Sequence, residues 1–141
     1  MRDAEAFLAS PRDPVLPSLL VFERGSGAPE LVGACGLGRR PSGAVELGYW
    51  ITRSRWGRGY ATEACSAMID IARTLGLPSI EGSHFVDNPA SGRVLRKLGF
   101  RSTGRTRPRF SAGRGEEAAC REYVLDLAEA PVVACPRAMA A

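Results

Sequence analysis

The sequence predicts a single α/β (α+β) domain with a mixed, mostly antiparallel sheet flanked by helices. Three short segments rich in β-branched and aromatic residues, separated by glycine- and proline-containing turns, predict an antiparallel meander. A segment with helical spacing of apolar residues and a further strand-like segment follow, and this strand–helix–strand connection implies a parallel pair of strands. The chain has 141 residues, 45% hydrophobic and 24% charged, which is enough for one domain with its own core.

The meander lies in the first part of the chain. Its predicted strands are Ser18 to Glu23, Leu31 to Gly38 and Val45 to Ile51, and the third is the central strand of the sheet. Before them, Asp3 to Ala9 is predicted to form a short helix, which prolines then interrupt.

A longer helix is predicted from Tyr60. Its apolar residues recur at i, i+3, i+4 and i+7, so one face should be buried: Ala61, Ala64, Cys65, Met68, Ile71, Ala72 and Leu75. Gly76 and Pro78 end this helix, and Ser79 to Val86 is predicted to be the next strand.

A second helix should follow that strand. Asn88 or Ser91 can cap its beginning, and Gly99 can end it in the left-handed conformation.

The last part of the predicted domain is a pair of strands. Phe100 to Thr106 and Glu122 to Leu127 are the expected strands, with Arg109 to Glu117 as the loop between them. The single domain therefore spans residues 1–127, and the alanine- and proline-rich segment 128–141 is expected to be a flexible tail.

The turn before the first long helix has the features of an anion-binding site. The first N–H groups of a helix have no partner within it, and the helix dipole places partial positive charge there. Gly57 and Gly59 let a bulky anion approach the backbone, and three arginines add charge: Arg53, Arg55 and Arg58. The predicted ligand is a phosphate or pyrophosphate on the amides of residues 57–62. The alternative is an ordinary surface loop, because the motifs GxxxxGK[ST] and GxGxxG are both missing.

Two motifs carry a resemblance to a known family. The first is Trp56-Gly57-Arg58-Gly59-Tyr60-Ala61, and the second is the N-x-x-S…LGF pattern from Asn88 to Phe100. In this order and at this separation they resemble the GNAT family of N-acetyltransferases, in particular its ribosomal-protein-alanine (RimJ/RimL-like) branch. Trp56 departs from the glutamine or arginine of the general motif. The resemblance covers about residues 15–127 and implies a GNAT-like sheet whose strands four and five are parallel and splayed.

The resemblance implies an activity. An acetyl group would pass from the co-substrate acetyl-CoA to a primary amine, on a protein N-terminus or a small molecule, by direct attack in a ternary complex without a metal. The pyrophosphate would sit on the glycine turn, the pantetheine arm along the third strand, and Gly48 would mark the bulge that opens the splay. The expected cofactor-binding residues are Tyr49, Trp50, Ile51, Trp56, Gly57, Arg58, Gly59, Tyr60, Ala61, Thr62, Asn88 and Ser91.

Two residues are candidates for proton transfer. Glu46 is the candidate base, because the histone-acetyltransferase branch carries its base here and strand alternation puts Glu46, Gly48 and Trp50 on one face. Ser91 is the candidate acid, since the N-x-x-S serine of the ribosomal branch approaches the sulfur of CoA. Leu95 stands where many members have a tyrosine. The alternatives are a solvated or arginine-paired Glu46 and a Ser91 that only caps its helix.

The N-terminus departs from the family pattern. Members usually begin with a strand and one or two helices, for which there is little room before Ser18. The sequence therefore predicts an N-terminally shortened chain that lacks one wall of the acceptor site, which supports a second hypothesis, a non-catalytic acyl-CoA-binding protein. It also predicts an exposed sheet edge that a homodimer could cover.

The composition indicates where the protein is located and which kinds of ligand it could bind. No apolar run is long enough to span a bilayer and the N-terminus has no apolar signal segment, so a cytoplasmic protein without a membrane partner is expected. The four cysteines lack metal-ligand spacing, and Cys35 and Cys65 should be small core residues. His84, the only histidine, is predicted to be an ordinary strand residue, and no metal site is expected.

The formal net charge of +4 would attract a polyanion such as CoA. The arginines of residues 101–114 allow a third hypothesis, an RNA-associated module, but Phe110 is the only aromatic residue among them. A solvated hairpin is therefore the better interpretation, and no specific nucleic-acid partner is expected.

Overall fold

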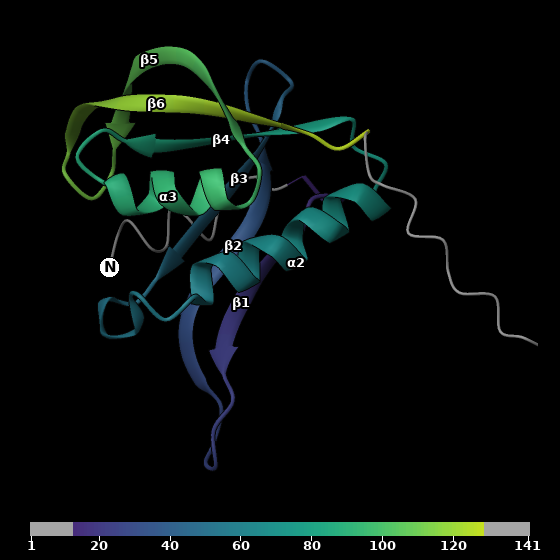
Figure 1. Ribbon diagram of the computed structural model, residues 1–141, viewed down its shortest axis with the longest axis vertical. Coiled ribbons are helices and arrows are strands. Elements are labelled where there is room, and N and C mark those ends of the chain that lie inside the picture. The colour runs from purple at the N-terminus through teal and green to yellow at the C-terminus, as the bar shows by residue number, and fades with distance from the viewer. Residues whose placement is uncertain (1–12, 129–141) are drawn as a thin grey trace, which may run out of the picture.

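The structure, a computed structural model, describes residues 13–128 and contains one six-stranded mixed sheet with helices. The elements are β1 (Ser18–Glu23), β2 (Glu30–Arg39), β3 (Val45–Ile51), the 3-10 helix η1 (Arg53–Arg55), α2 (Tyr60–Thr74), β4 (Ser79–Phe85), α3 (Pro89–Lys97), β5 (Arg101–Ser111) and β6 (Glu116–Asp126). In space the strands follow the order β1-β2-β3-β4-β6-β5 (Figure 1). The predicted mixed α/β architecture is confirmed. The predicted helix Asp3 to Ala9, Cys135 and the tail beyond residue 128 lie outside the described residues.

The meander forms as the sequence predicts. β1 pairs with β2 and β2 with β3, both antiparallel, and the predicted bounds of β1 and β3 match the observed ones. Along β3 the buried Val45 and Leu47 alternate with the more exposed Glu46 and Gly48. One face of this strand therefore faces the core and the other faces away from it.

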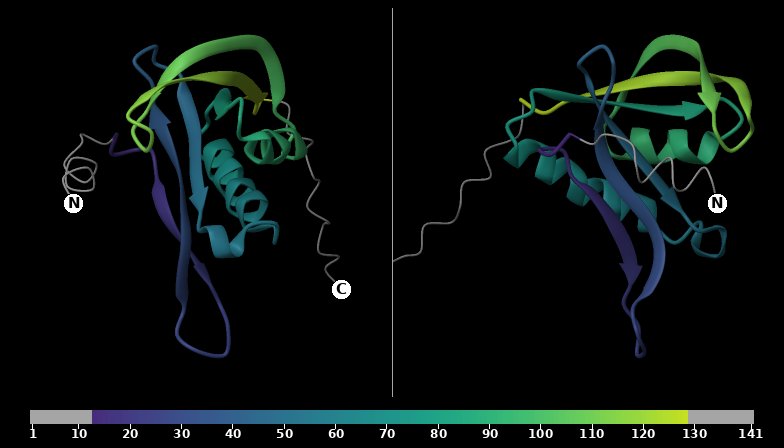
Figure 2. Two further views of the ribbon diagram at one scale, coloured as in Figure 1. Left: turned by 90° about the vertical axis from the view of Figure 1, so that its left-hand side faces the viewer. Right: turned by 180° about the vertical axis from the view of Figure 1, so that it is seen from behind.

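Both helices cover the same face of the sheet (Figure 2). α2 lies against β2 and β3 and buries Cys65, Met68, Ile69 and Ala72. The buried stripe is slightly rotated from the predicted one, because it includes Ile69 whereas Leu75 is 39% exposed. Cys35 on β2 meets Cys65 in this core, with 3.8 Å between the two Sγ atoms, so both are small core residues as predicted. Neither helix is long and apolar enough to cross a bilayer.

The sheet is divided between β3 and β4. These two strands are parallel, as the crossover connection predicts, but Glu46 and Glu81 are their one pair of residues in backbone register. Figure 1 shows β1 and β2 running in a clearly different direction from β4 and β6. The predicted splay of the parallel strands is therefore confirmed. The predicted bulge at Gly48 is wrong, because β2 and β3 stay in register through the Gly36–Gly48 pair.

The last hairpin is longer than predicted. β5 continues to Ser111 and β6 begins at Glu116, so most of the predicted loop Arg109 to Glu117 is strand. β5 is exposed along most of its length and lacks the apolar alternation that marks a half-buried strand. Backbone pairing with β6 holds it, with a register shift between Ser102 and Thr106. Most of the arginine-rich segment is thus one strand of an exposed hairpin, as the preferred interpretation of the sequence predicts.

Candidate functional site

A groove of about 290 Å³ opens where β3 and β4 part. The end of β3, the loop that leads into α2 and the first turn of α3 line it. All the residues predicted to bind the cofactor line this groove except Arg58 and Thr62, which lie in the same turn and the first turn of α2. Arg55, which was expected only to add charge to the turn, and Ala90, for which no role was predicted, also line it. Ala90 lies between Asn88 and Ser91, so the second motif contained the signal for it.

The glycine turn forms the end of the groove that could hold an anion. Gly57 and Gly59 have φ angles of 72° and 84°, in the left-handed region that residues other than glycine rarely adopt. Gly59 is the N-cap of α2, and no side chain caps that helix. A Cβ atom at either glycine would meet open space. The first amides of a fifteen-residue helix are thus accessible in the way that a phosphate group requires.

The other end of the groove holds two hydroxyl groups. The hydroxyl of Tyr49 lies 2.7 Å from Oγ of Ser91 and 3.2 Å from the carbonyl oxygen of the same residue. Burial raises the pKa of Tyr49 to about 12, so its hydroxyl keeps its proton at neutral pH. Asn88 is the N-cap of α3 and its Oδ1 accepts from the amide of Ser91 at 3.3 Å. Ser91 is therefore not the cap, and its hydroxyl group contacts Tyr49, which lines the groove with it.

The sequence predicts Tyr49 as a cofactor-binding residue but assigns no role to its hydroxyl group. The alternation of β3 could have placed its side chain, because Tyr49 is an odd number of residues from Glu46 and so lies on the opposite face of the strand. That is the face that the helices cover. Leu95, at the place of the family's tyrosine, is fully buried. The hydroxyl of Tyr123 lies 3.1 Å from Nε2 of His84 and accepts from Arg96, so it faces neither end of the groove. His84 is a buried strand residue, as predicted.

Glu46 lies on the opposite face of β3, in an open trough of about 530 Å³. Gly48 and Trp50 also line this trough, and the alternation of burial along β3 confirms that the three residues share one face. Arg109 on β5 donates to both carboxylate oxygens, at 2.6 and 3.0 Å, and Ser83 on β4 donates at 2.7 Å. Burial works to raise the pKa of Glu46, but these hydrogen bonds outweigh it and hold the pKa below its ordinary value. The arginine-paired alternative for Glu46 is the one found.

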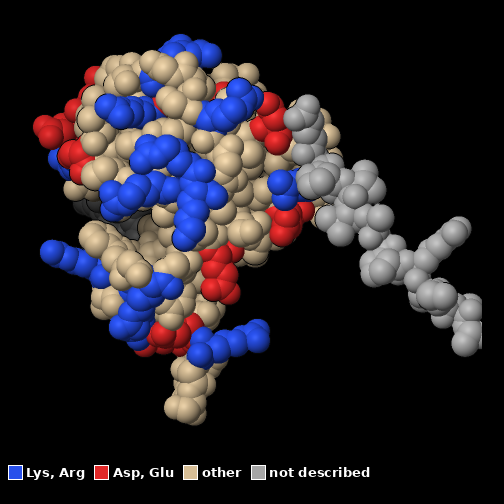
Figure 3. Space-filling view, viewed as in Figure 1, with Lys and Arg blue, Asp and Glu red and all other residues tan. Residues whose placement is uncertain are grey.

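The arginines of the turn differ in their surroundings. Arg55 donates to Glu23 at 2.7 Å and to Glu30 at 2.8 Å, so its charge is balanced by the β1–β2 hairpin. The expectation that Arg55 adds free positive charge to the anion site is therefore wrong, whereas Arg53 and Arg58 are exposed. Figure 3 shows basic side chains over α3 and around this turn, on either side of a hollow.

Trp56 also has a local partner, since its indole Nε1 donates to the carbonyl of Ile51 at 2.7 Å. This bond fixes the exit of the chain from β3 and occupies the Ile51 carbonyl oxygen. Trp56 itself stays 64% exposed, so its ring forms an accessible edge of the groove.

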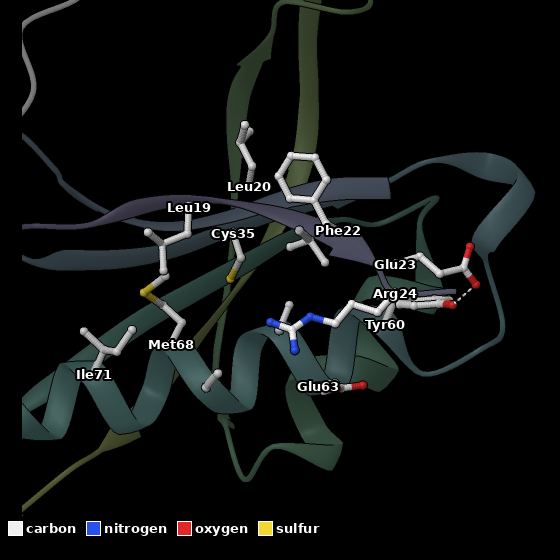
Figure 4. A pocket seen from close by; sticks show the side chains of 13 residues that line it. Leu19, Leu20, Phe22, Glu23, Arg24, Cys35, Tyr60, Glu63, Met68 and Ile71 are labelled. Atoms are coloured by element: carbon white, nitrogen blue, oxygen red, sulfur yellow. Dashed lines mark hydrogen bonds between the residues drawn. The ribbon is translucent and has the colours of Figure 1, made fainter. Parts of the chain in front are cut away.

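A larger hollow of about 590 Å³ lies between β1 and α2 (Figure 4). Leu19, Met68 and Ile71 make its apolar wall. The hydroxyl of Tyr60 donates to Glu23 at its end near the glycine turn. Tyr60 lines both hollows, but the larger one lacks the Tyr49 and Ser91 hydroxyl groups and the glycine turn. The smaller groove is the better candidate for a reaction site.

Comparison with known proteins identifies the class to which this architecture belongs. A family model described as an acetyltransferase (GNAT) domain matches residues 2–101, well over half of the chain. The chain therefore belongs to the GNAT acetyltransferase family.

Three relatives show how far the similarity extends. The uncharacterized N-acetyltransferase p20 of Bacillus licheniformis is 36% identical over 78 residues, which are 53% of this chain and 44% of p20. This chain thus spans less than half the length of that curated relative. The structure of yncA from Salmonella typhimurium, assigned as an acetyltransferase and solved with its cofactor acetyl-CoA, has a TM-score of 0.67 and 24% identity, covering 96% of this chain and 73% of that one. A structure from Vibrio cholerae, assigned as a ribosomal-protein-serine acetyltransferase, has a TM-score of 0.64 and 25% identity, covering 79% of this chain and 64% of that one. These similarities confirm the GNAT fold.

Proposed function

We propose that this chain is an N-acetyltransferase that uses acetyl-CoA to acetylate a primary amine. One observation carries the proposal: Tyr49 and Trp50 line both the groove and the trough, at the point where β3 and β4 separate. A cofactor in the groove and an amine entering from the trough would therefore meet at the same stretch of backbone.

The groove would take the pyrophosphate and pantetheine parts of an acyl-CoA molecule. The amides of residues 57–62 would hold the pyrophosphate, and each hydrogen bond to a charged group contributes roughly 1.5–3 kcal/mol. The backbone of residues 49–51 would lie along the pantetheine arm. When bound, acetyl-CoA supplies the activated acetyl group that the amine takes up directly. The turn is open for it, because α2 has no side-chain cap and a Cβ atom at Gly57 or Gly59 would meet no neighbour.

Tyr49 and Ser91 would assist the departure of the CoA thiolate. Their hydroxyl groups lie 2.7 Å apart in the groove, so either can donate to the other or to the departing sulfur. With its pKa raised to about 12, Tyr49 remains a hydrogen-bond donor through the neutral range. The pair would take over the role of the tyrosine whose place Leu95 occupies.

The weak basicity of Glu46 favours one kind of acceptor amine. A carboxylate held by Arg109 and Ser83 is a weak base, and it would act through a water molecule in the trough. A lysine amine with a pKa near 10.4 costs roughly 4.6 kcal/mol to neutralise at pH 7, whereas an α-amino group near 7.8 costs only about 1 kcal/mol. A weak base suffices for the α-amino group, so the expected acceptor is an α-amine.

Within the family, we place the chain in the ribosomal-protein (RimJ/RimL-like) branch, which acts on protein N-termini. Its two motifs meet in the groove, and one similar structure is assigned as a ribosomal-protein-serine acetyltransferase. The preference for an α-amine agrees with such an acceptor.

A second candidate is a non-catalytic acyl-CoA-binding protein. The burial of Leu95 and the engagement of Tyr123 with His84 favour it, because neither residue can supply a proton to the groove. The two candidates differ in turnover and not in cofactor binding.

Thermal unfolding with and without acetyl-CoA tests the binding site that both candidates share. At about a hundred times the dissociation constant, binding adds roughly 2.7 kcal/mol, which raises Tm by on the order of 5–10 °C for a domain of this size. Acetylation is then measured with peptides that carry free N-terminal alanine or serine, and with the same peptides blocked at the N-terminus but carrying lysine. Acetylation of free N-termini supports the enzyme; a Tm shift without acetylation of any amine supports the binding protein. No Tm shift would contradict both.

A further inference from the structure

We propose that Arg109 is a positioning residue that fixes the carboxylate of Glu46 in one orientation at the end of the trough. The proposal rests on the proposed function, because the trough is where the acceptor amine would enter. The sequence gives no hint of this role, since Arg109 lies in a segment that was predicted to be a loop.

The contact is unusual for its reach across the sheet. β4 and β6 lie between β3 and β5 in the strand order, yet the side chain of Arg109 reaches Glu46 on β3. Figure 1 shows β5 arching above β6, and the contact of Arg109 with Glu46 shows that the later part of β5 reaches β3. The register shift after Ser102 and the positive φ of 75° at Gly104 accompany this bend.

The geometry restricts Glu46 to one orientation. The two terminal nitrogens of Arg109 contact the two carboxylate oxygens at 2.6 and 3.0 Å, and a bidentate pair of this kind fixes the plane of the carboxylate. Ser83 donates to the same oxygen as the closer nitrogen, and Arg109 also donates to the Ser83 hydroxyl. The side chains of Glu46 and Arg109 are 17% and 33% exposed, so water screens the pair only in part.

Other charged groups surround the pair. Glu81 on β4 is the backbone partner of Glu46, but its carboxylate accepts from Arg40 at 2.9 Å. Glu122 on β6 lies 3.7 Å from both Arg40 and Arg107. Arg40 and Arg107 thus face the two neighbouring carboxylates, and Arg109 is the arginine that forms an ion pair with Glu46.

Arg109 would thus act on the reaction indirectly, by controlling the charge and the orientation of the Glu46 carboxylate. The guanidinium favours the charged form of the carboxylate and lowers its pKa, together with the hydrogen bond from Ser83 and the more distant Arg40. Glu46 then stays ionised and points in one direction, which is what a residue that orders water beside an incoming amine must do. Because Arg109 contacts Glu46 but lies outside the groove, its loss should leave acetyl-CoA binding intact.

Two variants of Arg109 and a matched control test the proposal. Arg109→Met removes the charge, and Arg109→Lys keeps it but cannot contact both oxygens in the planar manner of arginine. Arg107→Met is the control, because Arg107 lies two residues earlier on the same strand, is 60% exposed and makes only a 3.7 Å contact with Glu122. The first measurement is the pH titration of the Glu46 carboxyl carbon by ¹³C NMR in the three variants and the wild type. Its midpoint should move upward in Arg109→Met, by a smaller amount in Arg109→Lys, and not in Arg107→Met.

The second measurement is the pH–rate profile for an N-terminal peptide. Arg109→Met should lower kcat by roughly tenfold and move the acidic limb upward, whereas the Kd of acetyl-CoA stays within twofold of wild type. In a Glu46→Gln background, Arg109→Met should have no further effect. An unmoved Glu46 titration, an equal shift in Arg107→Met, or a profile that Arg109→Met leaves unchanged would each overturn the proposal. If the wild type acetylates no amine, the proposed function fails, and the NMR titration alone decides whether Arg109 positions Glu46.

Discussion

The hydroxyl of Tyr49 on β3 lies 2.7 Å from Oγ of Ser91 on α3, across the opening between the two parts of the sheet. One residue comes from the meander and the other from the helix after β4, so the contact exists only when both parts are in place. It also puts two hydrogen-bond donors at one point of the groove. This pair is the most direct link between the fold and the proposed acetyl transfer.

Replacing Tyr49 with phenylalanine should separate catalysis from binding. Tyr49→Phe keeps the ring but removes the hydroxyl, and loss of a proton donor lowers a rate typically by about 10²-fold or more. The Kd of acetyl-CoA should change little, because the proposed seat of the pyrophosphate lies at the other end of the groove. Steady-state kinetics with an N-terminal peptide, beside calorimetric Kd values, check both expectations. A rate within twofold of wild type would leave Ser91 as the only donor of the pair.

Gly59→Glu should abolish acetyl-CoA binding, because it places bulk and negative charge at the start of α2. The backbone strain of the substitution needs its own control, since φ at Gly59 is 84°. Gly43 has φ of 87° and also has open space around it, but it lies in the β2–β3 turn. Gly43→Glu should therefore cost similar stability and retain binding. Equal Kd values for Gly59→Glu and the wild type would remove the glycine turn as the phosphate seat.

Stability at high pH should depend on Tyr49. Its pKa is raised from 10.0 to about 12, chiefly by burial, so folding favours the protonated phenol. That contribution is fully present below pH 10 and is lost as the pH rises from 10 to about 12. Chemical denaturation of the wild type should show a fall in the free energy of unfolding across this window, and Tyr49→Phe should show a smaller one. Some fall should remain, because a hydrogen bond to Glu23 also raises the pKa of Tyr60. Identical pH dependence of the two proteins would contradict the prediction.

Gly92→Ala should destabilise the fold through a specific collision. A Cβ atom at position 92 would lie 2.5 Å from Nε2 of the buried His84. Overpacking of this kind typically costs about 1–3 kcal/mol, although alanine is about 1 kcal/mol better than glycine within a helix. Removing the imidazole should relieve the collision, so Gly92→Ala in a His84→Ala background should be neutral or stabilising. Urea unfolding of the four proteins gives the comparison, and an equal cost in both backgrounds would exclude the collision as the cause.

Most of the sheet could be predicted because each of its inner strands leaves a local signal. Val45 and Leu47 alternate with polar positions, and Gly59 and Gly99 mark the ends of helices at left-handed backbone positions. Most of the groove could be predicted for the same reason, since its residues lie at the end of the predicted third strand and in or beside the two short motifs.

The remainder depends on contacts that no local pattern encodes. β5 is a polar strand held by pairing with β6, so a prediction based on apolar alternation makes this strand too short. Arg109 and Glu46 are 63 positions apart, and their contact depends on how the hairpin bends over the sheet. The pairing of Arg55 with Glu23 and Glu30 likewise required the relative position of two elements.

β3 and β4 share only one pair of residues in backbone register, and this has a mechanical consequence. Backbone hydrogen bonds hold each half of the sheet along its length, but the seam between the halves depends largely on side chains such as Tyr49–Ser91 and Glu46–Arg109. We therefore expect the two halves to separate more easily than neighbouring strands within either half, because only one backbone pair and a few side-chain contacts join them. Amide hydrogen exchange should then be faster along the seam than in the middle of either half. A ligand that lies across the seam would join the halves and slow that exchange.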